Sequence, residues 1–84
     1  MPMKVVFTAT ARKSLRRVPA DRRARIVSRV EAVAAGERAD VQPLQGSDLL
    51  RLRVGEHRVL FAVDLTNQIL TVELVRTRGD VYKR

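Results

Sequence analysis

The sequence predicts an α+β domain: an N-terminal strand, an antiparallel helical hairpin and then a three-stranded antiparallel meander, with both helices on one face of the sheet. Three observations predict this fold. Apolar residues first recur with helical spacing and later alternate with polar ones, proline and glycine separate the two patterns, and 84 residues of 45% hydrophobic content supply one modest core. Residues 1–84 are therefore interpreted as a single domain.

The chain begins with a predicted strand and a short helix. Residues 3–8 are β-branched and aromatic, which is typical of a strand, and Thr8 or Thr10 can cap the helix that follows. In that helix Ala11 and Leu15 lie on one face and basic residues on the other. Pro19 ends the helix, because the residue before a proline is pushed out of the α region.

A second helix is predicted from Asp21, as its N-cap, to Gly36, as its stop. Ile26 and Val30 belong to its apolar stripe. Its basic residues are interpreted as a solvated face, with contact to ribosomal RNA as the alternative. These residues are Arg22, Arg23, Arg25 and Arg29.

Residues 36–48 lack periodicity and contain proline and glycine, so they are predicted to form a long loop. Strands are predicted at residues 49–54, 57–64 and 68–77. The first two flank Gly55 and Glu56, and glycine in the first position of a two-residue loop suits a type II′ turn, which requires a positive φ there.

That turn sets the register of the hairpin. It places Arg53 opposite Arg58 and Arg51 on the same face, whereas His57 falls on the other face. Arginines directly opposite each other repel, so the cluster costs stability and suggests a function. Strict alternation would put Arg76 on the apolar face, and a bulge or the strand end must redirect it. The apolar face, predicted to be the core, holds Leu50, Leu52, Val54, Val59, Phe61 and Val63.

The composition favours a nucleic-acid partner. Lys and Arg number 17 against 9 Asp and Glu, which gives a formal net charge of +8. Arginine enrichment from genome composition is the alternative, but it would scatter the arginines rather than gather them on one face. Cysteine is absent and there is one histidine, so we expect neither a metal nor another cofactor. No apolar run suits a signal peptide or a membrane span, and we expect a cytoplasmic protein.

Several motifs together resemble the RelE/ParE superfamily of toxins from type II toxin–antitoxin systems, and most of all its RelE branch. The resemblance covers nearly the whole chain, and each motif alone is loose. The motifs are Phe7-Thr8 with Ala11, Pro43-Leu44 with Gly46, the segment 51–61, and Arg76 followed by Asp80 and Tyr82.

The resemblance implies a ribosome-dependent endoribonuclease that cleaves mRNA without a metal and thereby inhibits translation. It implies an acidic antitoxin as partner, contact with mRNA and ribosomal RNA on the ribosome, operator DNA only through the antitoxin complex, and no membrane. The implied catalytic residues are Arg53, Arg58, Arg76 and Tyr82. The implied RNA-binding residues are Arg51, Arg53, Arg78 and Lys83.

Two positions depart from the family pattern. Arg51 and Arg53 stand where well-studied members carry lysine, and arginine is a poor general base because it is not deprotonated in proteins. His57 is not expected to replace that base, because the register turns it away from the arginines. Two alternatives therefore stay open: a ParE-like toxin that inhibits DNA gyrase, and a nucleic-acid-binding relative without catalysis.

Overall fold

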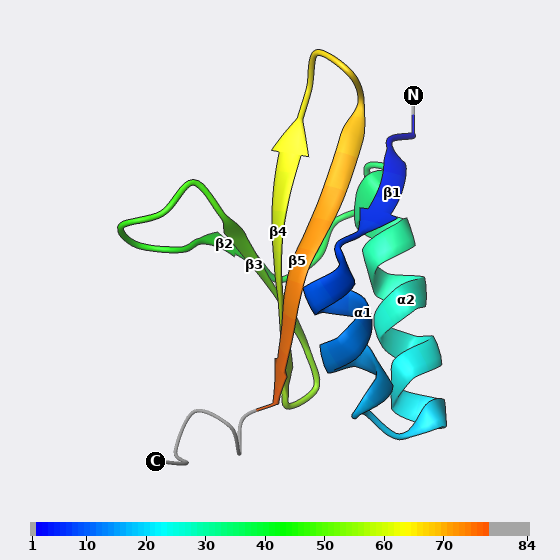
Figure 1. The fold of residues 1–84 in the computed structure, drawn as a ribbon. Coiled ribbons are helices and arrows are strands. Elements are labelled where there is room, and N and C mark those ends of the chain that lie inside the picture. The colour runs from blue at the N-terminus through cyan, green and yellow to red at the C-terminus, as the bar shows by residue number, and fades with distance from the viewer. Residues whose placement is uncertain (1, 78–84) are drawn as a thin grey trace.

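The computed structural model describes residues 2–77, which form a five-stranded sheet covered on one face by two helices (Figure 1). The strands lie in the order β1-β5-β4-β3-β2. The elements are β1 (Lys4–Phe7), α1 (Ala9–Arg16), α2 (Ala20–Ala34), β2 (Val41–Pro43), β3 (Leu50–Val54), β4 (His57–Asp64) and β5 (Ile69–Thr77). Neither helix is long and apolar enough to cross a membrane.

The helix ends follow local sequence signals with one correction. Thr8 caps α1, since its Oγ1 accepts a hydrogen bond of 3.0 Å from the Ala11 amide. The N-cap of α2 is Pro19 and not Asp21, which lies in the first turn. The Pro19 carbonyl accepts a hydrogen bond of 2.8 Å from the Arg23 amide, so the cap lies two residues earlier than expected. Asp21 instead favours the helix through its charge near the N-terminus.

The predicted stop of α2 is confirmed. Gly36 has a φ of 93°, a left-handed conformation that favours glycine. Its amide donates to the carbonyl of Val33, and the Glu37 amide donates to the carbonyl of Ala32, each at 3.0 Å. This pair of bonds is the Schellman motif, and it satisfies carbonyls that the end of a helix leaves free.

The sheet differs from the expected one at both of its edges. β1 pairs with β5 in parallel, so the sheet is mixed rather than wholly antiparallel. At the other edge, part of the predicted loop forms β2, antiparallel to β3. Val41 lies opposite Leu52 there and packs against the core. A three-residue strand is too short to show a period in sequence, and only its neighbour provides the hydrogen bonds that make it one.

The register of the β3–β4 hairpin is confirmed. Gly55 has a φ of 61°, and the structure pairs Arg53 with Arg58, Leu52 with Val59 and Val54 with His57. The helix-facing side of the hairpin is the core: Leu52, Val59 and Phe61 are each at most 2% exposed. Residues from both helices and from β5 complete the core, including Ala11, Leu15, Ile26, Val30, Leu70, Val72 and Val75.

A β-bulge in β5 redirects the end of that strand. Phe61 pairs with Val72 but the preceding Leu60 pairs with Leu74, so Glu73 is an extra residue in β5. The insertion reverses the alternation beyond it. Leu74 therefore lies on the open face rather than in the core, while Val75, 4% exposed, is buried on the helix side.

Candidate nucleic-acid interface

Three arginines form a row across the face of the sheet that neither α1 nor α2 covers. Arg53 of β3 pairs with Arg58 of β4, and Arg58 pairs with Arg76 of β5. Side chains of directly paired residues have Cβ atoms about 5 Å apart and project from the same face. The bulge thus brings Arg76, which strict alternation would bury, into line with the hairpin arginines. Arg53 and Arg76 are exposed, and Arg58 between them is half-buried.

The next row of the same face is largely apolar. Arg51 pairs with Leu60, and Leu60 pairs with Leu74. Leu60 is only 9% exposed although no helix covers it. Arg51 is half-buried, and its Nε is buried with no hydrogen-bond partner in the part of the chain that the structure describes. Its guanidinium thus keeps donor capacity for a ligand.

The arginine row (Arg53, Arg58 and Arg76) is not neutralised from within residues 2–77. The ion pair found in that region joins Arg22 to Glu56, and it involves none of the three. Like charges on neighbouring strands repel, so the row stores an unfavourable electrostatic energy that a bound anion would relieve. A guanidinium binds two phosphate oxygens at once, so the row suits an RNA backbone.

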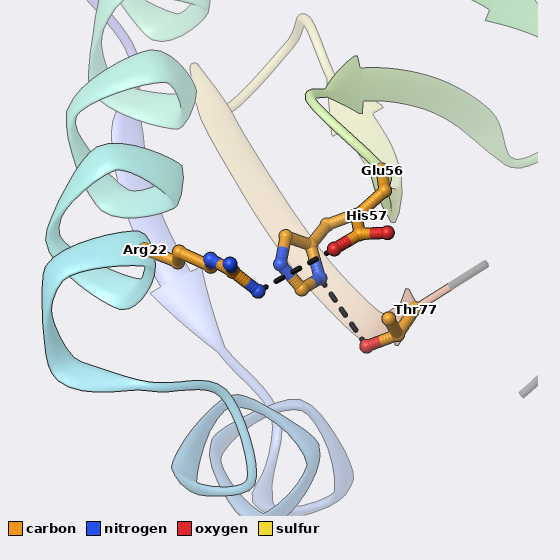
Figure 2. Close-up of polar contacts among 4 residues, drawn as sticks. All are labelled: Arg22, Glu56, His57 and Thr77. Atoms are coloured by element: carbon orange, nitrogen blue, oxygen red, sulfur yellow. Dashed lines mark hydrogen bonds and ion pairs between the residues drawn. The ribbon is translucent and has the colours of Figure 1, made fainter. Parts of the chain in front are cut away.

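His57 lies on the opposite face of the sheet, as the register predicts. It is 4% exposed, and its Nδ1 is 3.2 Å from the Thr77 hydroxyl (Figure 2). The sheet therefore separates the imidazole from the arginine row. The row consists of arginines, and arginine is a poor general base because it is not deprotonated in proteins. The implied site residues Arg78, Tyr82 and Lys83 lie outside the described residues.

The structure contains two cavities near this interface that the sequence did not predict. One, of about 330 Å³, lies between α1 and β5 and is lined by Arg17 together with Arg76. The other, of about 190 Å³, lies at the tip of the hairpin and is lined by Arg22, Arg25 and His57, among others. The sequence predicts mainly a solvated face for the arginines of the second helix. Helical spacing shows which face a residue occupies, but not which strand ends beside it.

Comparison with solved structures shows the same fold in bacterial and archaeal proteins. No protein-family model matches the chain, and no curated protein does. A chain in the crystal structure of the toxin–antitoxin complex RelBE2 from Mycobacterium tuberculosis is 27% identical with a TM-score of 0.84, over 95% of both chains. A chain of the archaeal RelE–RelB complex from Pyrococcus horikoshii is 24% identical with a TM-score of 0.76, over 94% of this chain and 98% of that one.

The likeness is to the toxin chain of such complexes. The isolated E. coli RelE toxin also superimposes, with a TM-score of 0.76 at 20% identity, over 95% of this chain and 90% of that one. The resemblance that the sequence motifs suggested is therefore confirmed, and the fold is that of RelE-like toxins.

Proposed function

We infer that this chain, which has the fold of the RelE/ParE superfamily, is the toxin of a type II toxin–antitoxin pair and cleaves mRNA bound to the ribosome. The observation that carries the proposal is the arginine row, three guanidiniums held side by side on a hydrogen-bonded sheet and without an ion pair within residues 2–77. The similarity of the whole chain to chains of toxin–antitoxin complexes supports the assignment as a toxin.

In the proposed reaction the 2′-oxygen of a nucleotide attacks the adjacent phosphorus and loses its proton. The bond from phosphorus to the 5′-oxygen breaks, and that oxygen gains a proton. A cyclic phosphate and a 5′-hydroxyl result. Negative charge accumulates on the phosphate oxygens in the transition state, and the arginine row stabilises it. Because the sheet holds the guanidiniums in place beforehand, little reorganisation is needed at the moment of reaction.

The residues of this chain account for the charge stabilisation better than for the proton transfers. Arginine is in general a poor general base, and His57 lies on the other face. We therefore propose that most of the rate enhancement comes from positioning and electrostatics, with groups of the ribosomal RNA assisting. Tyr82 is proposed to stack on a base and orient the nucleotide. Arg51, Arg78 and Lys83 are proposed to bind the RNA backbone.

The proposed partner is an acidic antitoxin that covers the arginine row. A cationic face next to the apolar residues Leu60 and Leu74 suits an anionic segment that folds as it binds. Operator DNA is proposed to contact this chain only through that complex. Co-expression with the antitoxin should therefore relieve growth inhibition.

A second candidate function is RNA binding without cleavage. The observation that favours it is the absence of a general base from the arginine row. Arg53 of the row, like Arg51 beside it, stands where well-studied members of the superfamily carry lysine. A ParE-like action on DNA gyrase is the third possibility.

One experiment separates the three functions. Purified protein is added to a translating extract, and mRNA ends are mapped by primer extension. We expect new 5′ ends within the coding region, at ribosome positions, soon after addition. Translation arrest without new ends would favour the binding function. An unaffected extract, combined with loss of gyrase supercoiling activity, would overturn the assignment as a ribonuclease.

RNA binding by the free protein should depend steeply on salt. Each phosphate contact to a single strand releases about 0.7 counterions, so three arginine contacts imply a log–log slope near −2. Affinity should then fall about 20-fold between about 50 and 200 mM salt. Fluorescence anisotropy with a non-cleavable RNA measures the slope. A slope near zero would remove the arginine row from the binding surface.

A further inference from the structure

The helix-facing side of the hairpin tip carries a cavity that the proposed cleavage does not use. It has a volume of about 190 Å³ and lies between the N-terminal half of α2 and the β3–β4 turn. This is about six times the roughly 30 Å³ that a water molecule occupies in the liquid. The cavity thus has room for a phosphate group with its hydration, but it is smaller than the usual pocket for a drug-sized ligand. It is lined by Arg22, Arg25, Val54, Gly55, Glu56 and His57.

His57 gives this cavity a buried polar atom without a partner. The residue is 4% exposed, and its Nδ1 approaches the Thr77 hydroxyl at 3.2 Å. Nε2 is buried and has no hydrogen-bond partner in the described part of the chain. Figure 2 shows this nitrogen on the side of the ring away from Thr77, toward α2. When the Thr77 hydroxyl donates to Nδ1, Nε2 carries the proton and is a donor without an acceptor.

Two arginines bring positive charge to the same cavity. Arg22 and Arg25 are three residues apart on α2, so they project from the same side of the helix. Arg22 Nη1 contacts Glu56 Oε2 at 3.4 Å, and these two side chains are 53% and 54% exposed. An exposed pair at this distance is weak. The contact shows that the mouth of the cavity accepts a carboxylate oxygen, and a stronger oxyanion can displace it.

We propose that His57, Arg22 and Arg25 form a second phosphate-binding subsite, which takes a phosphate of the RNA strand whose scissile phosphate lies on the arginine row. Three donors converge there, and an oxyanion would satisfy the buried Nε2. The inference rests on the proposed RNA-binding function. It adds that the RNA strand passes around the tip of the β3–β4 hairpin.

The order of residues in the hairpin places the two sites next to each other. The pair Arg53–Arg58 directly precedes the pair Val54–His57 toward the turn, and the two pairs project to opposite faces. Beyond them the turn consists of Gly55 and Glu56 alone. An RNA strand that leaves the arginine row at this end therefore meets the subsite after it crosses the hairpin tip. RNA is favoured over a protein carboxylate because arginines lie on both sides of the hairpin tip, Arg53 and Arg58 on one face and Arg22 and Arg25 at the cavity on the other.

Length-dependent binding tests the proposal with non-cleavable 2′-deoxy-modified oligonucleotides. A trinucleotide spans the arginine row, whereas a decanucleotide also reaches the subsite. Arg25→Ala and His57→Gln should weaken binding of the decanucleotide roughly tenfold, the loss expected for one charge-assisted hydrogen bond. They should leave binding of the trinucleotide unchanged. The matched control is Arg38→Ala, which removes the same charge from an exposed residue outside the cavity and should change neither affinity.

Inorganic phosphate provides a second readout that needs no RNA. Titration with phosphate should shift the NMR signals of the His57 ring in the wild-type protein but not in Arg22→Ala/Arg25→Ala. Both arginines are exposed, so this variant should fold even if His57→Gln does not. Phosphate binding without any length effect would overturn the RNA subsite. So would equal losses for Arg25→Ala and Arg38→Ala, or an effect of Arg25→Ala confined to an acidic antitoxin peptide.

Failure of the proposed function gives a different result. Arg58→Ala should weaken binding of both oligonucleotides, because both lie on the arginine row. If Arg58→Ala leaves both affinities unchanged, the arginine row is not the RNA-binding face. A loss seen only with the decanucleotide in Arg25→Ala would then still establish the subsite as an RNA contact.

Discussion

Arg58→Ala and Arg76→Ala should each lower the rate of mRNA cleavage about 100-fold, because removal of one preorganised charge costs on the order of 3 kcal/mol in the transition state. Both side chains belong to the arginine row and neither fills the core. Arg58→Ala also removes repulsion from both neighbours, so its melting temperature should stay unchanged or rise slightly. Cleavage is followed by primer extension, and thermal melting is measured on the same samples.

The control for this result is His57→Ala. His57 is buried on the helix side of the sheet, so its removal should lower the melting temperature and affect cleavage less than Arg58→Ala does. Lost cleavage in His57→Ala at an unchanged melting temperature, together with normal cleavage by both arginine variants, would place the chemistry on the other face. The proposed mechanism would then be wrong.

Leu52→Ala should lower the free energy of unfolding by about 2–5 kcal/mol, a large part of the total for a small domain. Leu52 is 1% exposed and belongs to the core that the helices cover. Truncation there leaves a cavity that surrounding side chains fill only in part. Urea denaturation measures the loss, which should appear as a lower midpoint with an unchanged slope.

Leu60→Ala is the matched control, since it removes the same atoms from the opposite face of the same hairpin. Leu60 is 9% exposed and lies between Arg51 and Leu74 with no helix above it. Flexible neighbours and water can fill the space, so the expected loss is only about 1–2 kcal/mol. Equal losses for the two leucines would mean that both faces of the sheet are packed, which would leave no open surface for RNA.

The helix ends show how far local signals reach. Gly36 is confirmed as the stop of α2, and Thr8, one of two candidate caps beside Thr10, is the cap of α1. Each acts through hydrogen bonds to residues a few positions away. Asp21 was wrong as the N-cap, because Pro19 two residues earlier supplies the first helical carbonyl acceptor. Several nearby residues compete for one helix start, and sequence alone does not rank them.

Local sequence signals are enough to predict the hairpin and the face that its arginines share. Gly55 sets a two-residue turn, and a period of two residues then assigns Arg53 and Arg58 to one side and His57 to the other. These relations span a few residues, so the local backbone decides them. The sequence also predicts that a bulge or the strand end redirects Arg76, because strict alternation would have buried a guanidinium.

Which distant segments meet depends on the packing of the whole domain. It placed the bulge at Glu73 and thereby completed the arginine row with Arg76. It set β1 parallel to β5, and it brought Arg22 to Glu56 across 34 positions of sequence beside the buried ring of His57. Such contacts depend on how the helices and the sheet share one core. The hydrophobic pattern of a segment does not predict them, because the same apolar face could pack equally well against a different neighbour.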